Sequence, residues 1–228
     1  MAVIVGNTDG IGAALTRRLL DTGWSVVGVS RRSGAVDHPR YSHAVVDVTD
    51  PHYVSSLAAA VSRVDLCVYA AGVGDLVDLD HLAEQTRTLD VNLLGLARTV
   101  EVVVPAMVAA GSGHLIGLSS LADAAPSGPA PAYSASKAGM SSYLQGLRLA
   151  LRGHGVAVTT IRFGFVDTKM AKSPVRPAMM SVDRAVAVVE SAVRSRRAVL
   201  SRPRRMSALM VLVRLVSAVA VRRPVRGT

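Results

Sequence analysis

The chain has 228 residues, half of them apolar, so it is long enough for one large domain with a buried core and too apolar for a disordered protein. Its net charge of +10 comes from one end, because residues 191–228 contain ten arginines and no acidic residue, whereas residues 1–190 contain 16 basic and 16 acidic residues. The single cysteine, Cys67, excludes an internal disulfide, and the histidines lack the spacing of a metal site.

Short apolar runs alternate with segments of helical periodicity. Residues 2–5 predict a strand, and after a glycine-rich turn the apolar spacing predicts a helix that ends at Gly23. We expect further strands at residues 25–30, 44–48, 65–70, 114–120, 156–163 and 198–201, and helices at residues 51–62, 79–110, 131–153 and 181–196. Short, almost wholly apolar strands between helices are typical of parallel strands covered on both faces. The sequence therefore predicts an α/β fold, a doubly wound parallel sheet of the Rossmann type in one domain, residues 1–202, followed by a tail, residues 203–228, with a basic apolar C-terminal helix.

A glycine cluster, VGNTDGIG at residues 5–12, joins the first predicted strand to the first helix. Glycine permits a sharp turn and lets a pyrophosphate approach backbone N–H groups at the positive end of a helix. A simple tight turn is the alternative interpretation. The position directly after the first strand favours a nucleotide-binding loop.

Three further polar features lie where chemistry is expected. Tyr133 and Lys137, in YSASK, are four residues apart and share one face of a predicted helix. A nearby ammonium would lower the tyrosine pKa from about 10 toward a value useful for proton transfer. Ser120 ends a predicted strand, where ligands bind in this type of sheet, and Asn92 is a polar residue within an apolar helix. Taken singly, each of these features also fits a surface pair or a buried amide without a function.

Together, these features resemble the short-chain dehydrogenase/reductase family, over about residues 2–202. The matching segments follow the family's order and spacing: GNTDGIG, DVTD (47–50), AAG (70–72), LDVNLLG (89–95), LIGLSS (115–120), YSASKAG (133–139) and RFGFVDT (162–168). The sequence departs from the family pattern at Val5, Ala70 and Phe163, none of which stands in for a catalytic group.

The resemblance implies roles for the polar residues. Tyr133 would protonate a carbonyl oxygen as hydride arrives, or act as the base in reverse, and Lys137 would lower its pKa and hydrogen-bond the nicotinamide ribose. Ser120 would orient the carbonyl, and Asn92 would hold a water in a proton relay to Lys137. The resemblance implies a cofactor site that contains Gly6, Thr8, Asp9, Gly10, Ile11, Gly12, Arg31, Arg32, Asp47, Val48, Ala71, Gly72, Tyr133, Lys137, Gly164, Val166 and Thr168.

The end of the second predicted strand bears on the choice of cofactor. An NAD enzyme typically has an acidic residue there for the ribose 2′-OH, but this chain has Ser30, Arg31 and Arg32. Arginine binds phosphate well, so we predict NADP(H) rather than NAD(H). Two solvated loop arginines are the alternative.

In the family, the segment equivalent to residues 169–180 closes over the substrate. Its methionines favour an apolar substrate portion, and Lys169, Lys172 and Arg176 could meet an anionic group, although an ordinary mobile loop is the alternative. The segment that follows Arg162 is similar to one branch of the family, the reductase subunits of decaprenylphosphoryl-ribose 2-epimerase, which reduce a lipid-linked keto-sugar. We therefore expect a small-molecule or lipid-linked carbonyl substrate.

The tail contains 16 residues between Arg205 and Arg222, interrupted by Arg214, which is too short and too charged to span a bilayer. Two interpretations stay open: peripheral contact with a membrane surface, or docking on this subunit or a neighbouring one. Nucleic-acid binding is not expected, because stacking aromatics are absent from the tail.

The leading hypothesis is a cytoplasmic NADP(H)-dependent reductase or dehydrogenase. The resemblance implies a homodimer or homotetramer formed through the helices at about residues 87–110 and 131–153. One alternative is a nucleotide sensor without catalysis. Another is a reductase subunit of a larger complex at the inner face of the membrane.

Overall fold

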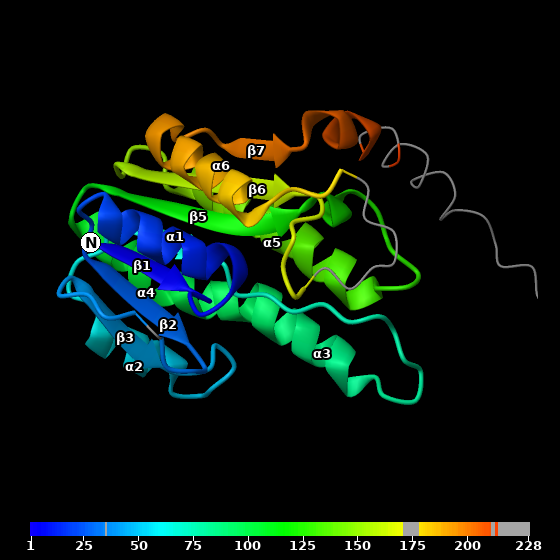
Figure 1. The fold of residues 1–228 in the computed structure, drawn as a ribbon, viewed down its shortest axis with the longest axis horizontal. Helices are drawn as coiled ribbons and strands as arrows, with labels where there is room; N and C mark the ends of the chain where they lie inside the picture. The colour runs from blue at the N-terminus through cyan, green and yellow to red at the C-terminus, as the bar shows by residue number, and fades with distance from the viewer. Residues whose placement is uncertain (35, 171–177, 211–212, 214–228) are drawn as a thin grey trace, which may run out of the picture.

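The computed structural model describes residues 1–34, 36–170, 178–210 and 213. Within them, seven strands form one sheet in the order β3-β2-β1-β4-β5-β6-β7, and each pairing is parallel (Figure 1). The strands are β1 Ala2–Val5, β2 Val26–Ser30, β3 Tyr41–Val45, β4 Leu66–Tyr69, β5 Gly113–Ser120, β6 Val156–Phe163 and β7 Val199–Arg202. The predicted doubly wound parallel sheet is confirmed, and its strand order reverses direction between β1 and β4.

Helices cover both faces of the sheet, as Figure 1 shows for α1 and α6 on one face and α4 and α5 on the other. The helices are α1 Gly10–Asp21, α2 Tyr53–Ala60, α3 Ala83–Leu89, α4 Gly95–Ala109, α5 Pro131–Ala150 and α6 Val182–Ser195. Ser181 caps α6 by accepting a hydrogen bond from the Arg184 N–H.

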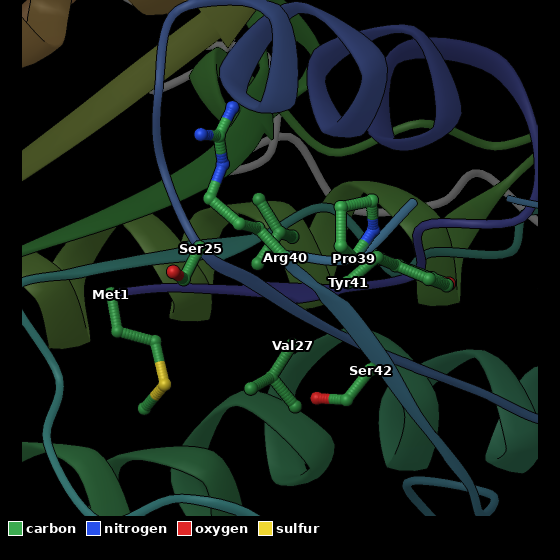
Figure 2. A pocket seen from close by; sticks show the side chains of 8 residues that line it. Met1, Ser25, Val27, Pro39, Arg40, Tyr41 and Ser42 are labelled. Atoms are coloured by element: carbon green, nitrogen blue, oxygen red, sulfur yellow. The ribbon is translucent and has the colours of Figure 1, made fainter. Parts of the chain in front are cut away.

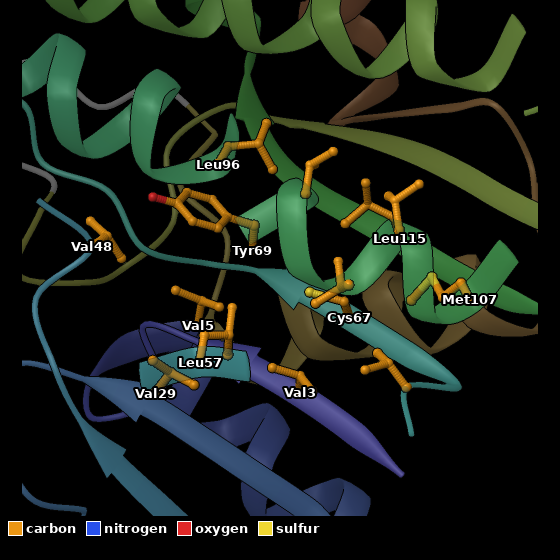
Figure 3. Close-up of a cluster of buried hydrophobic side chains, with 14 of the residues drawn as sticks. Val3, Val5, Val29, Val48, Leu57, Cys67, Tyr69, Leu96, Met107 and Leu115 are labelled. Atoms are coloured by element: carbon orange, nitrogen blue, oxygen red, sulfur yellow. The ribbon is translucent and has the colours of Figure 1, made fainter. Parts of the chain in front are cut away.

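Two apolar cores lie on opposite sides of the sheet. Along β1, Val3 and Val5 face the core under α2, α4 and α5, whereas Ala2 and Ile4 face the core under α1 and α6. Figure 3 shows the first of these cores, in which Tyr69 and Leu96 pack beside Val5. Burial of both faces explains why the strands are almost wholly apolar.

The segment from Ala83 to Ala109 is helical throughout, with a π-helical turn over Asp90–Leu94 between α3 and α4. It is the one stretch of the described residues that is long and apolar enough to span a membrane. Half of that stretch is buried within the fold, and Leu96, Val103 and Met107 belong to the core. The segment is therefore accounted for as a core helix.

The predicted strand at residues 44–48 is displaced toward the N-terminus. The strand β3 occupies Tyr41–Val45, and the chain then turns at Asp47, whose carboxylate accepts hydrogen bonds from the Thr49 N–H and hydroxyl at 3.0 Å each. β3 is a half-exposed edge strand, so its polar residues fit the sheet, while the more apolar run after it leaves the sheet. The consequence is that Asp47 and Val48 lie beyond the strand end.

A pocket of about 220 Å³ opens at the amino ends of β2 and β3 (Figure 2). Its lining residues are Met1, Ser25, Val26, Val27, Pro39, Arg40, Tyr41 and Ser42. Ligands of doubly wound sheets bind at the opposite edge, outside the carboxyl ends of the strands. The functional site is therefore expected at that other edge.

The tail begins with a helical segment at residues 204–210. Near its start, Met206 Sδ and Pro203 Cδ lie against Gly164, at 3.0 and 3.2 Å from the position a Cβ would take there. The expectations for Lys172, Arg176 and most of the predicted C-terminal helix lie outside the described residues.

Candidate active site

The glycine loop lies at the point where the strand order reverses. Gly6 has a φ of +84°, and a Cβ there would lie 2.5 Å from the Ala71 backbone nitrogen at the end of β4. A Cβ on Gly12 would overlap the Gly6 carbonyl oxygen. Only glycines therefore allow the loop to pack this closely beside the start of α1, the end of a helix that attracts phosphate.

Asp9 places a carboxylate at the start of α1. Its Oδ1 accepts a hydrogen bond from the Gly10 N–H at 2.8 Å and so caps the helix. Its Oδ2 lies 3.0 Å from Lys169 Nζ and 4.0 Å from Arg32 Nη2. The hydrogen bond with Lys169, followed by that with Gly10, holds the pKa of Asp9 below its ordinary value. The carboxylate is therefore neutralised by two cations from separate segments.

A pocket of about 490 Å³ borders this carboxylate, between α1 and the segment that follows β6. Its lining residues are Thr8, Asp9, Gly10, Ala13, Ala14, Arg17, Asp167, Thr168, Lys169 and Val182. Thr168 Cγ2 lies 3.0 Å from the position a Cβ on Gly10 would take, so the RFGFVDT segment meets the glycine loop. Val166 in the same segment is buried and forms a bridge with Met180.

The two arginines predicted to bind a phosphate follow β2. Arg31 Nε lies 3.7 Å from Asp47 Oδ2, and both arginine side chains are largely exposed, at 53% for Arg31 and 69% for Arg32. Val48, next to Asp47, is buried against Gly95. The arginines and Asp47 thus lie at the same edge as the glycine loop, with their functional groups open to solvent.

Tyr133 and Ser120 come together from α5 and the end of β5. Burial raises the pKa of Tyr133 above its ordinary value, and the nearby Ser120 hydroxyl partly offsets this effect. A Cβ on Gly74 would lie 2.7 Å from the Tyr133 ring, so the chain after β4 covers one face of the ring.

Lys137 is 3% exposed, and its Nζ donates a hydrogen bond to the Leu118 carbonyl oxygen at 3.0 Å. Nζ lies 5.8 Å from the centroid of the Tyr133 ring. Burial lowers the pKa of Lys137 to about 8. Burial disfavours the charged form of both groups, and a lowering of the Tyr133 pKa by Lys137 stays a prediction.

Asn92 lies in the π-helical turn and is fully buried. Its Oδ1 accepts from the Val73 N–H at 2.8 Å, and its Nδ2 donates to the Val73 carbonyl and to Ser136 Oγ at 2.9 Å each. Oδ1 and Lys137 Nζ both flank Gly72, at 3.4 and 3.5 Å from the position of a Cβ there. The amide therefore fixes the loop after β4, and its oxygen keeps one acceptor site for the predicted water relay.

Sequence reasoning missed a polar network behind Ser120. The Asp123 carboxylate forms an ion pair with Arg162 and accepts a hydrogen bond from Ser141 Oγ at 2.6 Å. Ser141 Oγ lies 2.7 Å from Ser119 Oγ, which donates to the Lys137 carbonyl oxygen at 3.2 Å. This network joins the ends of β5 and β6 to α5. The arginine within the apolar run of β6 was its one signal in the sequence.

The residues at this edge fit a nicotinamide dinucleotide. The glycine loop and the start of α1 suit a pyrophosphate. Arg31 and Arg32 offer cations for the adenosine end of the dinucleotide, and Tyr133 and Lys137 lie where its nicotinamide end would bind. No cluster of metal-ligating side chains occurs among the described residues.

The chain is similar to known oxidoreductases in sequence and to a solved dehydrogenase in fold. The model of the short chain dehydrogenase family matches residues 1–177. An uncharacterized oxidoreductase of Myxococcus xanthus is 35% identical over 184 residues, which cover 74% of this chain and 73% of that protein. Sulfoacetaldehyde reductase 2 of Chromohalobacter salexigens is 32% identical over 186 residues, with the same coverage of both chains. A solved short chain dehydrogenase from Burkholderia cenocepacia in complex with NADP has a TM-score of 0.84 at 24% identity, covering 96% of this chain and 94% of that one.

These matches agree with the parallel sheet described above. The chain belongs to the short-chain dehydrogenase/reductase family of oxidoreductases.

Proposed function

We propose that this protein transfers a hydride between NADP(H) and a carbonyl compound or the corresponding secondary alcohol, with Tyr133 as the general acid or base. The observation that carries the proposal is the cluster of a phenol, a hydroxyl and a buried ammonium beside the glycine loop. A bound nicotinamide would supply or accept the hydride. Tyr133 would hand its proton to the carbonyl oxygen, and Ser120 would hydrogen-bond the same oxygen.

The choice of NADP(H) over NAD(H) is supported by the Arg31–Arg32 pair. Both guanidinium groups are exposed at the cofactor edge and have only long contacts with carboxylates, so they are available for a 2′-phosphate. The solved structure from Burkholderia cenocepacia contains NADP, which is consistent with this preference.

For the substrate, we propose a carbonyl compound with an apolar portion and an anionic group. Met170 Cε lies 3.2 Å from the position of a Cβ on Gly72, beside Asn92 and Lys137, and supplies an apolar contact at the site. Lys169 precedes it, and its ammonium is paired with Asp9 but remains largely exposed, so it can also meet an anionic group. Sulfoacetaldehyde, named for one relative, combines an aldehyde with a sulfonate. A lipid-linked keto-sugar phosphate, which combines a ketone with a phosphate and an apolar chain, is the alternative.

The decisive experiment replaces Tyr133 by phenylalanine. We expect Y133F to lower kcat by about 10²–10⁴-fold, the usual contribution of general acid–base catalysis. The dissociation constant for NADP⁺, measured by calorimetry, should change less than about threefold, because Phe keeps the ring that packs on Gly74. Tyr143→Phe, on the same helix but outside the site, serves as the matched control.

Substrates for this assay come from a screen with NADPH and NADH. The screen contains aldehydes and ketones with and without a sulfonate, carboxylate or phosphate, and keto-sugars with and without a lipid. Unchanged turnover in Y133F would reject the proposed mechanism. Nucleotide binding without turnover on any substrate would favour the sensor hypothesis instead.

We also propose a homo-oligomer formed through α4 and α5, which light scattering of the full chain tests.

Membrane contact through the tail is tested by co-sedimentation with anionic lipid vesicles, comparing the full chain with one that ends at residue 203. Equal sedimentation of the two chains would exclude it.

A further inference from the structure

Three side chains connect the glycine loop to the arginine-bearing turn after β2. Asn7, which follows Gly6 and is 2% exposed, donates from Nδ2 to Tyr41 Oη at 2.7 Å. Tyr41 Oη lies 2.6 Å from His43 Nδ1, and His43 Nε2 lies 2.9 Å from the Arg32 carbonyl oxygen. Tyr41 and His43 come from the same face of β3, two residues apart. We call Asn7, Tyr41 and His43 the relay.

The hydrogen bonds of the relay all donate in the same direction, from Asn7 through Tyr41 and His43 to the Arg32 carbonyl. The Arg32 carbonyl can only accept, so His43 Nε2 carries the proton and His43 Nδ1 presents a lone pair. Tyr41 then donates to Nδ1 and accepts from Asn7. When His43 is neutral, each of these hydrogen bonds has one donor and one acceptor, although Asn7 Oδ1 has no partner among the described residues. Burial, the larger of two opposing effects, holds the pKa of His43 below its ordinary value.

Two glycines make room for the relay. A Cβ on Gly28, in β2, would overlap Asn7 Nδ2 and would lie 2.7 Å from Tyr41 Oη. A Cβ on Gly34, in the turn after β2, would overlap Tyr41 Oη and would lie 2.9 Å from His43 Nδ1. The side chains of the relay therefore fit only because positions 28 and 34 are both glycine.

The relay acts on the backbone of the turn and leaves its side chains free. The Arg32 carbonyl oxygen also accepts a hydrogen bond from Ser30 Oγ at 2.7 Å, so it is held by two donors. The guanidinium groups of Arg31 and Arg32, in contrast, are more than half exposed. A fixed backbone with free guanidinium groups is a preorganised arrangement, which lowers the entropy lost when a ligand binds.

We propose that the relay positions the Arg31–Arg32 turn for the 2′-phosphate of NADP(H), so that Tyr41 and His43 are positioning residues for cofactor specificity. This inference rests on the proposed preference for NADP(H). The relay contacts the turn through the Arg32 carbonyl and not through the guanidinium groups. Loss of the His43 bond to this carbonyl should therefore weaken binding of the 2′-phosphate while leaving the rest of the nucleotide site in place.

The test measures the dissociation constants of adenosine 2′,5′-bisphosphate and 5′-AMP for the full chain by calorimetry. The two ligands differ only in the 2′-phosphate. The variants are Tyr41→Phe and His43→Leu, with Tyr143→Phe and His154→Leu as controls for the same changes away from the relay. We expect the relay variants to bind the bisphosphate about tenfold more weakly, the effect of about one hydrogen bond, and to bind 5′-AMP within about twofold of the wild type.

A His43→Gln variant adds a rescue measurement, because its amide can still donate to the Arg32 carbonyl. It should recover part of the bisphosphate affinity that His43→Leu loses. Equal weakening of both ligands in Tyr41→Phe, or no weakening, would overturn the role of the relay, and this variant decides the matter alone if His43→Leu does not fold. A wild-type protein that binds the bisphosphate no better than 5′-AMP would instead reject the preference for NADP(H).

Discussion

Replacing Asp123 by asparagine removes one charge from a buried ion pair behind Ser120. The Asp123 side chain is 2% exposed and is paired with Arg162, whose side chain is 22% exposed. Arg162 Nε is also buried and has no hydrogen-bond partner among the described residues. The amide oxygen of the asparagine can still accept from Ser141 Oγ, so Asp123→Asn removes the charge and little else.

The expected loss follows from what remains buried. Removing one partner of a buried ion pair typically costs about 3–5 kcal/mol, because the other charge is left without compensation. Arg162 keeps some contact with solvent, so we expect the lower end, about 3 kcal/mol, in the free energy of unfolding. For a protein of this size, that corresponds to a decrease in Tm of about 6–12 °C.

Urea denaturation and thermal melting of Asp123→Asn, Arg162→Met and the double variant measure this loss. The double variant leaves no unpaired charge, so the two losses should not add, and the cycle should give a coupling of at least about 2 kcal/mol. Glu84→Gln is the control, because its pair with Arg87 is long at 4.0 Å and exposed, and it should change stability by less than about 0.5 kcal/mol. A loss below about 1 kcal/mol in Asp123→Asn, or additive single losses, would refute the reasoning.

Two further predictions concern the cofactor edge. The pKa of Lys137 is about 8 in the fold against an ordinary 10.5, so its buried charge is unfavourable at neutral pH and the unfolded chain binds the extra proton between these values. The free energy of unfolding of the wild type should therefore rise by about 3 kcal/mol relative to that of Lys137→Met as the pH increases from about 8 to 10.5. Denaturation at several pH values measures this difference, and a difference that stays constant with pH would contradict the prediction. A Cβ on Gly12 would overlap the Gly6 carbonyl, so Gly12→Ala should lower the affinity for NADP⁺ at least about tenfold, as measured by calorimetry. Gly146→Ala is the control and should leave this affinity unchanged, because a Cβ at position 146 meets no atom within 4 Å.

Most of the fold could be predicted from local signals. Strand and helix positions follow from short apolar runs and helical periodicity, and Ser181 marks the start of α6 because a serine side chain can cap a helix. The displaced strand β3 shows the limit of such signals. An edge strand needs few apolar residues, so hydrophobicity indicated residues 44–48, and hydrogen bonding to β2 selected Tyr41–Val45 instead.

In the candidate site, too, some features follow from the sequence and others only from the fold. Gly6, Ser120, Tyr133 and Lys137 could be recognised from the sequence, because turn chemistry, strand ends and helical spacing are properties of short segments. The structure alone decided the direction of the Tyr133 pKa, which depends on how much water the fold removes from the phenol.

The sequence by itself determined the class of fold and the set of reactive groups, since both are encoded over a few neighbouring residues. Only the tertiary structure decided which distant polar groups support them. Asp123 meets Arg162 across 39 positions, and Asn7 meets Tyr41 across 34. Such pairs carry no periodicity, because the partners come from different strands and helices and meet only where the sheet brings their ends together.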